Sequence, residues 1–126
     1  SAAIHSMLKM AQSELSISSA DFDADPMLLN CQNGTIDLRT GELRSHRAED
    51  YITKMCAASY EPLAESAVWL EFLAQVFPDS GVREFVQRFS GYACTGLVTE
   101  DCLAFFVGSG ANGKTTFTQA LQYVLA

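Results

Sequence analysis

The sequence predicts an α+β fold, in which a mainly helical N-terminal domain with a small β-hairpin or meander precedes the first strand, loop and helix of an α/β domain. Three observations predict this fold. Short β-favouring runs joined by Asn-Gly and Thr-Gly pairs fill residues 27–44. Apolar residues recur at helical spacing over residues 65–94. A glycine-rich loop follows an unbroken apolar run and opens another helical pattern in residues 103–126.

The first predicted element is an amphipathic helix over residues 3–16. Its apolar positions share the spacing of one helix face and are Ile4, Met7, Leu8, Ala11 and Leu15. Residues 16–25 are polar and acidic and end at a proline, so we expect a loop there.

A β-meander is predicted next. Residues 27–38 form a hairpin pattern, because two short β-favouring runs flank the Asn-Gly pair at 33–34. The Thr-Gly pair at 40–41 predicts a second turn, with a third strand from Glu42. Residues 51–60 are rich in β-branched and aromatic side chains and predict one more strand.

Two amphipathic helices should follow, over residues 65–77 and from about 80 to 94. Pro78 breaks the pattern between them, and Asp79 or Ser80 can cap the second helix. Gly96 is a plausible stop. Because the link is so short, we expect the two helices to pack against each other as a hairpin.

The charge balance argues against a surface built to hold duplex DNA. The chain has 8 Lys and Arg against 15 Asp and Glu, a net charge of −7, whereas proteins that neutralise DNA phosphates carry an excess of basic residues. Hydrophobic residues make up 48%, which is typical of a globular protein. No apolar run approaches the roughly 20 residues that cross a bilayer, and no signal peptide is visible. We expect a cytoplasmic protein with no membrane partner.

The cysteines are Cys31, Cys56, Cys94 and Cys102. They include no C-x-x-C pair, so their spacing predicts neither a zinc site nor a redox site. We interpret them as small apolar side chains in a reducing compartment.

The motif that carries chemistry is G-x-x-x-x-G-K-[ST], a P-loop, at residues 108–115. Successive backbone N–H groups curled around a triphosphate supply donors, and glycines allow the required backbone angles and close approach. The following helix directs its positive end at the same anion. The residues predicted to hold ATP are Gly108, Ser109, Gly110, Ala111, Asn112, Gly113, Lys114, Thr115 and Thr116.

Two of these side chains have predicted roles in catalysis. Lys114 reaches the β- and γ-phosphates, and the Thr115 hydroxyl is a ligand for Mg²⁺. Hydrolysis also needs a metal-binding acid on a neighbouring strand and a cation for the transition state, and these usually follow the P-loop. Eleven residues follow Thr115 here. We therefore expect the parent protein to be the ATPase and the 126-residue chain alone to be inactive.

The motif, with Asn112 before Gly-Lys, resembles the Walker A of superfamily 3 helicases. The similarity extends to the phage and plasmid primase-helicases and their poxvirus relatives, and it covers essentially the whole chain. The segments that carry it are residues 21–54, 60–62, 69–79, 85–96 and 108–116.

The resemblance implies two domains: a helical pre-helicase domain over residues 1–98, and the start of an AAA+-like motor over residues 99–126. It also implies a homo-oligomeric ring that hydrolyses ATP and translocates on single-stranded DNA in replication. Two alternatives stay open: another P-loop NTPase, such as a small-molecule kinase or DNA packaging ATPase, and a docking or oligomerisation module without its own activity.

Five basic side chains gather in the predicted meander: Arg39, Arg44, His46, Arg47 and Lys54. They could contact DNA, or they could form a solvated face offset by Glu42, Glu49 and Asp50. With the acidic net charge, we expect the chain itself to bind single-stranded DNA weakly or not at all.

Residues 103–107 lack polar alternation, which predicts a strand buried on both faces of a parallel sheet. We expect its partner strands beyond residue 126. Without them, the segment could be disordered, could dock on the chain's own helices, or could pair between chains. We favour self-association through this segment.

Overall fold

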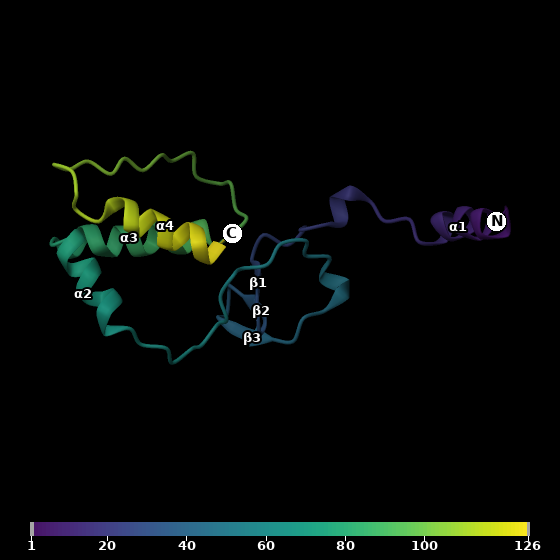
Figure 1. Cartoon of the computed structure of the whole chain (residues 1–126), viewed down its shortest axis with the longest axis horizontal. Helices are drawn as coiled ribbons and strands as arrows, with labels where there is room; N and C mark the ends of the chain where they lie inside the picture. Colours follow the sequence, from purple (N-terminus) through teal and green to yellow (C-terminus); the bar gives the residue numbers. More distant parts are fainter. Residues whose placement is uncertain (1, 126) are drawn as a thin grey trace.

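The computed structural model describes residues 2–125, apart from the side chain of residue 13. Figure 1 shows α1 at one end, a small sheet in the middle, and α2, α3 and α4 together at the other end. The elements in chain order are α1 (Ala2–Glu14), η1 (Ser19–Asp21), β1 (Leu28–Cys31), β2 (Gly34–Asp37), β3 (Glu42–Arg44), η2 (Ala48–Asp50), α2 (Ala67–Val76), α3 (Ser80–Ala93) and α4 (Lys114–Leu125).

The fold is α+β, as predicted, and its sheet is the expected antiparallel meander in the order β1-β2-β3. Cys31 pairs with Gly34, so the hairpin turn lies one residue earlier than predicted, at residues 32–33. Gly34 instead begins β2, with a φ of 155°. A Cβ there would collide with the carbonyl oxygen of Arg44 and lie 2.9 Å from Leu43 Cδ1. The close approach of β3, and not the turn, requires this glycine.

The strand predicted over residues 51–60 does not form. The segment runs beside β1 and is held by a mixture of backbone and amide hydrogen bonds. Cys56 N donates to Asn30 O at 2.8 Å, and Gln32 Nε2 donates to Cys56 O at 2.8 Å. Asn33 pairs with both backbone groups of Tyr60 at 2.9 Å. Because side-chain amides replace part of the ladder, the segment lacks regular strand pairing.

Helices α2 and α3 begin at side-chain caps. Ser66 Oγ accepts from Trp69 N at 3.2 Å, and Asp79 Oδ1 accepts from Val82 N at 2.9 Å, which confirms the predicted cap of α3. Gly96 does not stop that helix, which ends at Ala93. Its N–H donates to Pro26 O at 2.7 Å and thereby ties α3 to the start of the sheet.

Two groups of buried side chains form the core. The meander cluster is Cys31, Ile36 and Cys56, packed by Leu29, Leu38, Leu43, Tyr60 and Leu125. The helical cluster is Phe77, Val86 and Phe117, packed by Trp69, Phe72, Leu73, Val76, Phe106 and Leu121. Because α4 supplies Phe117 to one cluster and Leu125 to the other, this helix joins the two ends of the core.

The expected hairpin of α2 and α3 forms only in part. The two helices meet at the turn that joins them and diverge from there (Figure 1). Phe117 of α4 packs between them, stacked on Trp69 with 6.1 Å between ring centroids. Arg83 Nη1 donates to Phe77 O at 2.7 Å and to Pro78 O at 2.8 Å, so it satisfies carbonyls at the end of α2.

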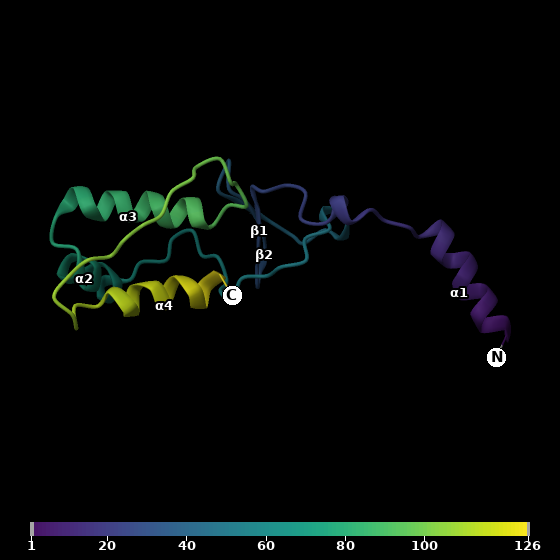
Figure 2. The same ribbon diagram turned by 90° about the horizontal axis from the view of Figure 1, so that it is seen from above.

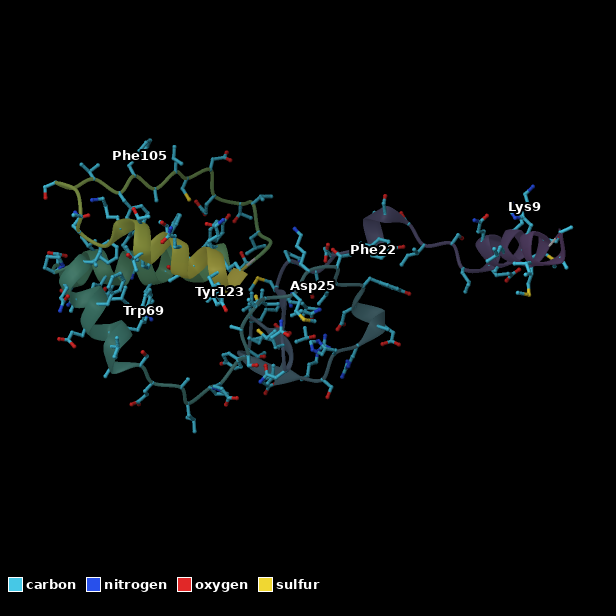
Figure 3. The ribbon with its side chains drawn as sticks, in the orientation of Figure 1. Lys9, Phe22, Asp25, Trp69, Phe105 and Tyr123 are labelled. Carbon is cyan, nitrogen blue, oxygen red and sulfur yellow. The ribbon has the colours of Figure 1, made fainter. Side chains whose placement is uncertain are left out.

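Residues 103–107 form no strand in the described structure, which corrects the prediction of a buried one. The segment runs alongside α4 and α3 in both ribbon views (Figures 1 and 2). Phe106 packs into the helical cluster, whereas Leu103, Phe105 and Val107 are 77%, 81% and 91% exposed. Figure 3 shows Phe105 directed away from the helices. Docking on the chain's own helices is thus seen, and self-association stays a prediction.

In the part of the chain that the structure describes, every helix is too short or too polar to span a bilayer.

Gly34→Ala should lower the free energy of unfolding by about 2 kcal/mol or more, because its Cβ meets the backbone of β3. The matched control is Gly91→Ala in α3, where an added Cβ meets nothing within 4 Å. We expect that change to be neutral or to stabilise by up to about 1 kcal/mol. Urea unfolding followed by circular dichroism measures both. A Gly34→Ala midpoint equal to that of the wild type would contradict the predicted collision.

Candidate phosphate-binding loop

The predicted site residues lie together in one loop and the first turn of the helix after it. Residues 108–113 connect the extended segment 103–107 to α4. Gly110, Ala111 and Gly113 have φ angles of 91°, 47° and 79°. The Gly113 carbonyl accepts the hydrogen bond of Phe117 N at 3.0 Å. The loop therefore turns sharply and ends where α4 begins, as the glycine positions predicted.

The Lys114 side chain folds back over the start of this loop. Its Nζ donates to Asn112 Oδ1. A Cβ on Gly108 would collide with Asn112 Nδ2 and lie 2.7 Å from Lys114 Nζ. Only the mobile ends of two polar side chains lie this close to Gly108, and the ammonium is directed to the loop. The motif pattern gave no signal for the Asn112 contact, because that position admits any residue.

Gly113 is required by its packing against α2. A Cβ at Gly113 would collide with the Val76 side chain and lie 3.1 Å from Phe72 Cε2. No pattern in the sequence predicted that Val76 and Phe72 lie against the loop. The contact joins a helix of the predicted N-terminal domain to the loop, and only the tertiary fold reveals it.

The other predicted residues are accessible. Ser109, Ala111, Thr115 and Thr116 are all exposed. Within residues 2–125, no group of three or more His, Cys, Asp and Glu side chains could hold a metal ion. The role of the Thr115 hydroxyl as a ligand for Mg²⁺ stays a prediction.

An apolar cavity of about 350 Å³ adjoins the loop. Asn112 and Lys114 lie at its polar edge, and its walls come from α2, α3 and residues 103–107. The ammonium thus lies between an apolar wall and water.

Two arginines of the meander, Arg39 and Arg44, are paired with acids. Arg39 Nη2 lies 2.6 Å from Asp25 Oδ1, and its Nη1 lies 3.3 Å from Asp37 Oδ1. Arg44 holds Asp50 through two contacts of 2.8 and 2.9 Å. The hydrogen bonds from Arg39 and Arg44 lower the pKa of Asp25 and of Asp50 from the ordinary value near 3.8. This neutralisation favours a solvated structural face over a DNA contact.

The other three basic side chains of this region are Arg47, Lys54 and His46, and they are not part of these ion pairs. Arg47 and Lys54 are exposed. His46 Nδ1 lies 3.4 Å from the hydroxyl of Thr35, which is completely buried and donates to Asn30 Oδ1 at 2.6 Å. His46 therefore lies next to the Thr35–Asn30 hydrogen bond between β2 and β1.

Comparison with known proteins places the chain among viral relatives. Residues 1–78 match the family described as D5 N terminal like. The chain is 28% identical over 109 residues to "Putative helicase L207/L206" of Acanthamoeba polyphaga mimivirus, which covers 83% of this chain and 11% of that protein. It is 31% identical over 104 residues to "Putative helicase 121R" of Invertebrate iridescent virus 3, which covers 79% of this chain and 11% of the relative. The match thus spans about a tenth of each relative.

Alanine substitutions at Gly110 and Gly113 test whether the loop packs against α2. Gly110 and Gly113 both have a positive φ, but an added Cβ at Gly110 meets nothing within 4 Å. Both changes to Ala should cost about 1–2 kcal/mol for the backbone angle. Gly113→Ala should cost about 1–3 kcal/mol more, because it overpacks Val76. Equal urea midpoints for the two variants would show that α2 does not constrain the loop.

The Arg44–Asp50 pair predicts acid sensitivity. Because the folded-state pKa of Asp50 is lowered, its contribution to stability is present above the unfolded-state value and is lost as the pH falls through the folded value. The free energy of unfolding should therefore drop below about pH 4, and Asp50→Asn should show a smaller drop. Urea unfolding at neutral and acidic pH measures this. Glu49→Gln, in the same short helix, is the control and should follow the wild type, and an unchanged slope in Asp50→Asn would contradict the prediction.

Proposed function

We propose that this chain, which belongs to the D5 N terminal like family, is a segment of an ATP-dependent replicative DNA helicase of the primase-helicase type. In this proposal the parent protein comes from a phage, prophage or plasmid and belongs to superfamily 3. Residues 1–98 are its pre-helicase domain, and residues 99–126 begin its motor domain. The relatives named helicases support the general assignment. The P-loop motif supports the finer one.

The observation that carries the nucleotide-binding proposal is the position of Lys114 over the loop. An ammonium beside Gly108, within a loop of left-handed backbone angles at the start of α4, has the chemistry to hold a polyphosphate. In the proposal, an incoming phosphate oxygen replaces Asn112 Oδ1 as the partner of the ammonium. The loop N–H groups and the positive end of α4 supply the remaining donors.

The proposed cofactors are ATP and Mg²⁺. Thr115 is exposed on the first turn of α4 and would give its hydroxyl to the metal. Bound Mg²⁺ neutralises charge on the β- and γ-phosphates, and Lys114 does so from the protein side. The acid that completes the metal site and the cation that completes the transition state would come from other parts of the parent protein.

The proposed partners follow from the same assignment. The parent protein would form a homo-oligomeric ring in the host cytoplasm and translocate on single-stranded DNA. This chain would contribute little to that DNA contact, because its net charge is −7 and Arg39 and Arg44 are paired with acids. A kinase or packaging ATPase would use the same loop, and the helicase relatives favour the first proposal over these.

A second candidate function, an oligomerisation module, has its own support. Apolar side chains are exposed at both ends of the molecule, on α1 and on residues 103–107. Such surfaces are typical of protein contacts. This role is compatible with the helicase, because one segment can assemble a motor and carry its phosphate loop.

Lys114→Ala should weaken the binding of a fluorescent ATP analogue to the chain at least ten-fold in the presence of Mg²⁺, since a charge-assisted hydrogen bond is worth about 1.5–3 kcal/mol. In the parent protein the same change should abolish hydrolysis, whereas Thr115→Ala should mainly weaken the Mg²⁺-dependent part of binding. Lys9→Ala on α1 removes the same charge far from the loop and should bind as the wild type does. Wild-type affinity in a folded Lys114→Ala protein would refute the phosphate-binding proposal.

A further inference from the structure

The apolar cavity of about 350 Å³ beside the candidate phosphate-binding loop carries charge of one sign. We call it the loop cavity. Among the residues that the structure describes, Lys114 is the one charged residue that lines it, and Asn112 is the one other polar residue. The Lys114 ammonium is held by the neutral Asn112 amide and meets no carboxylate in this lining. The loop cavity therefore fits a ligand with an anionic group at one end and an uncharged, largely apolar body.

One wall of the loop cavity offers an aromatic ring. Phe85 of α3 lines this wall and is 54% exposed. Its ring stacks on that of Phe89, with 6.2 Å between the ring centroids and 24° between the ring planes. Because Phe89 supports the ring, Phe85 can contact a flat ligand without first being ordered, which lowers the entropic cost of binding.

The opposite wall, residues 103–107, offers polar groups as well as apolar side chains. Across residues 2–125, the backbone N–H and C=O groups of this segment make no hydrogen bond to another protein group. A nucleotide base has hydrogen-bond donors and acceptors along its edge and a π-face on each side, whereas an acyl chain has neither. This wall therefore favours a base over an acyl chain as the body of the ligand.

The loop cavity is continuous with the loop that we propose holds phosphates, because Asn112 and Lys114 belong to both. In a nucleotide, a ribose joins the anionic phosphates to the flat base. The protein presents matching groups in the same order, first the ammonium at the loop and then the aromatic and apolar walls. One ligand can thus occupy the loop and the cavity together.

We propose that the loop cavity receives the base and ribose of the nucleotide whose phosphates lie on residues 108–115, with the base against the Phe85 ring. This inference rests on the proposed function and extends it. It makes α3, in the predicted pre-helicase domain, part of the nucleotide site. The phosphates alone then account for only part of the affinity.

Two ligands separate the base from the phosphates: ATP, and inorganic triphosphate, which lacks the base and ribose. Isothermal titration calorimetry with the full chain and Mg²⁺ measures both affinities. Wild-type chain should bind ATP at least ten-fold more tightly than inorganic triphosphate, because only ATP fills the cavity. Lys114→Ala should weaken the binding of both ligands, since it acts on the phosphates.

Phe85→Ala should weaken ATP binding about ten-fold and leave the affinity for inorganic triphosphate unchanged. Ala104→Trp fills the cavity from the opposite wall and should have the same effect. Phe22→Ala is the matched control, because Phe22 is 41% exposed, pairs with one ring, that of Tyr51, and lies away from α2, α3 and α4 in Figure 3. It should bind both ligands as the wild type does. Retained triphosphate binding also shows that each variant is folded.

Other outcomes overturn the proposal. Equal wild-type affinities for ATP and inorganic triphosphate would refute the base site and leave the phosphate site standing. Wild-type ATP affinity in both Phe85→Ala and Ala104→Trp would do the same. A chain that binds neither ligand would refute the proposed function and this inference together. Laurate probes the other class of occupant: laurate binding that Phe85→Ala abolishes, with no difference between ATP and triphosphate, would assign the cavity to an acyl anion.

Discussion

The position of the candidate phosphate-binding loop depends on the burial of one side chain, Phe117. It is 2% exposed and contacts Phe77 edge-to-face at 5.3 Å between centroids, as well as Trp69 and Phe106. Burial of a phenylalanine contributes about 1.5–3 kcal/mol, and each well-oriented aromatic pair adds about 0.5–1.5 kcal/mol. Because Phe117 follows Lys114 by three residues in α4, fixing it also fixes the helix start and the loop before it. The loop is held by its neighbours in the core as much as by its own glycines.

Sequence patterns predicted those elements whose determinants are local. The four helices, the cap at Asp79 and the three strands of the meander follow from spacing and turn residues in short windows. The patterns could not identify partners distant in the chain. Residues 51–60 have β-favouring side chains, but the amides of Gln32 and Asn33 hold them in an irregular path. Residues 103–107 are apolar enough for a buried strand, but within the described residues Phe106 packs on helices instead.

The candidate site divides in the same way. The motif residues are contiguous, so the sequence alone brought them together in one loop, whereas their supports come from elsewhere. Nothing near Gly113 indicates that Val76 lies against it, because 37 positions separate the two residues along the chain. The pairing of Arg39 with Asp25 likewise spans two strands, β1 and β2, and the turn between them. A cluster of basic residues in a sequence thus acquires its meaning only when the positions of the acids are known.

The two ends of α4 have a consequence for the order in which the chain acquires its structure. The meander needs contacts between residues close in sequence, and such contacts form early because little loop entropy is lost. Leu125 packs on the cluster of Cys31, and Ala57 N donates to Val124 O at 3.1 Å. During synthesis the N-terminal elements emerge first, so both clusters stay incomplete until α4 leaves the ribosome. Until then the apolar side chains of both clusters stay exposed on the nascent chain. A chaperone that binds exposed apolar side chains could therefore bind this chain until α4 emerges and covers them.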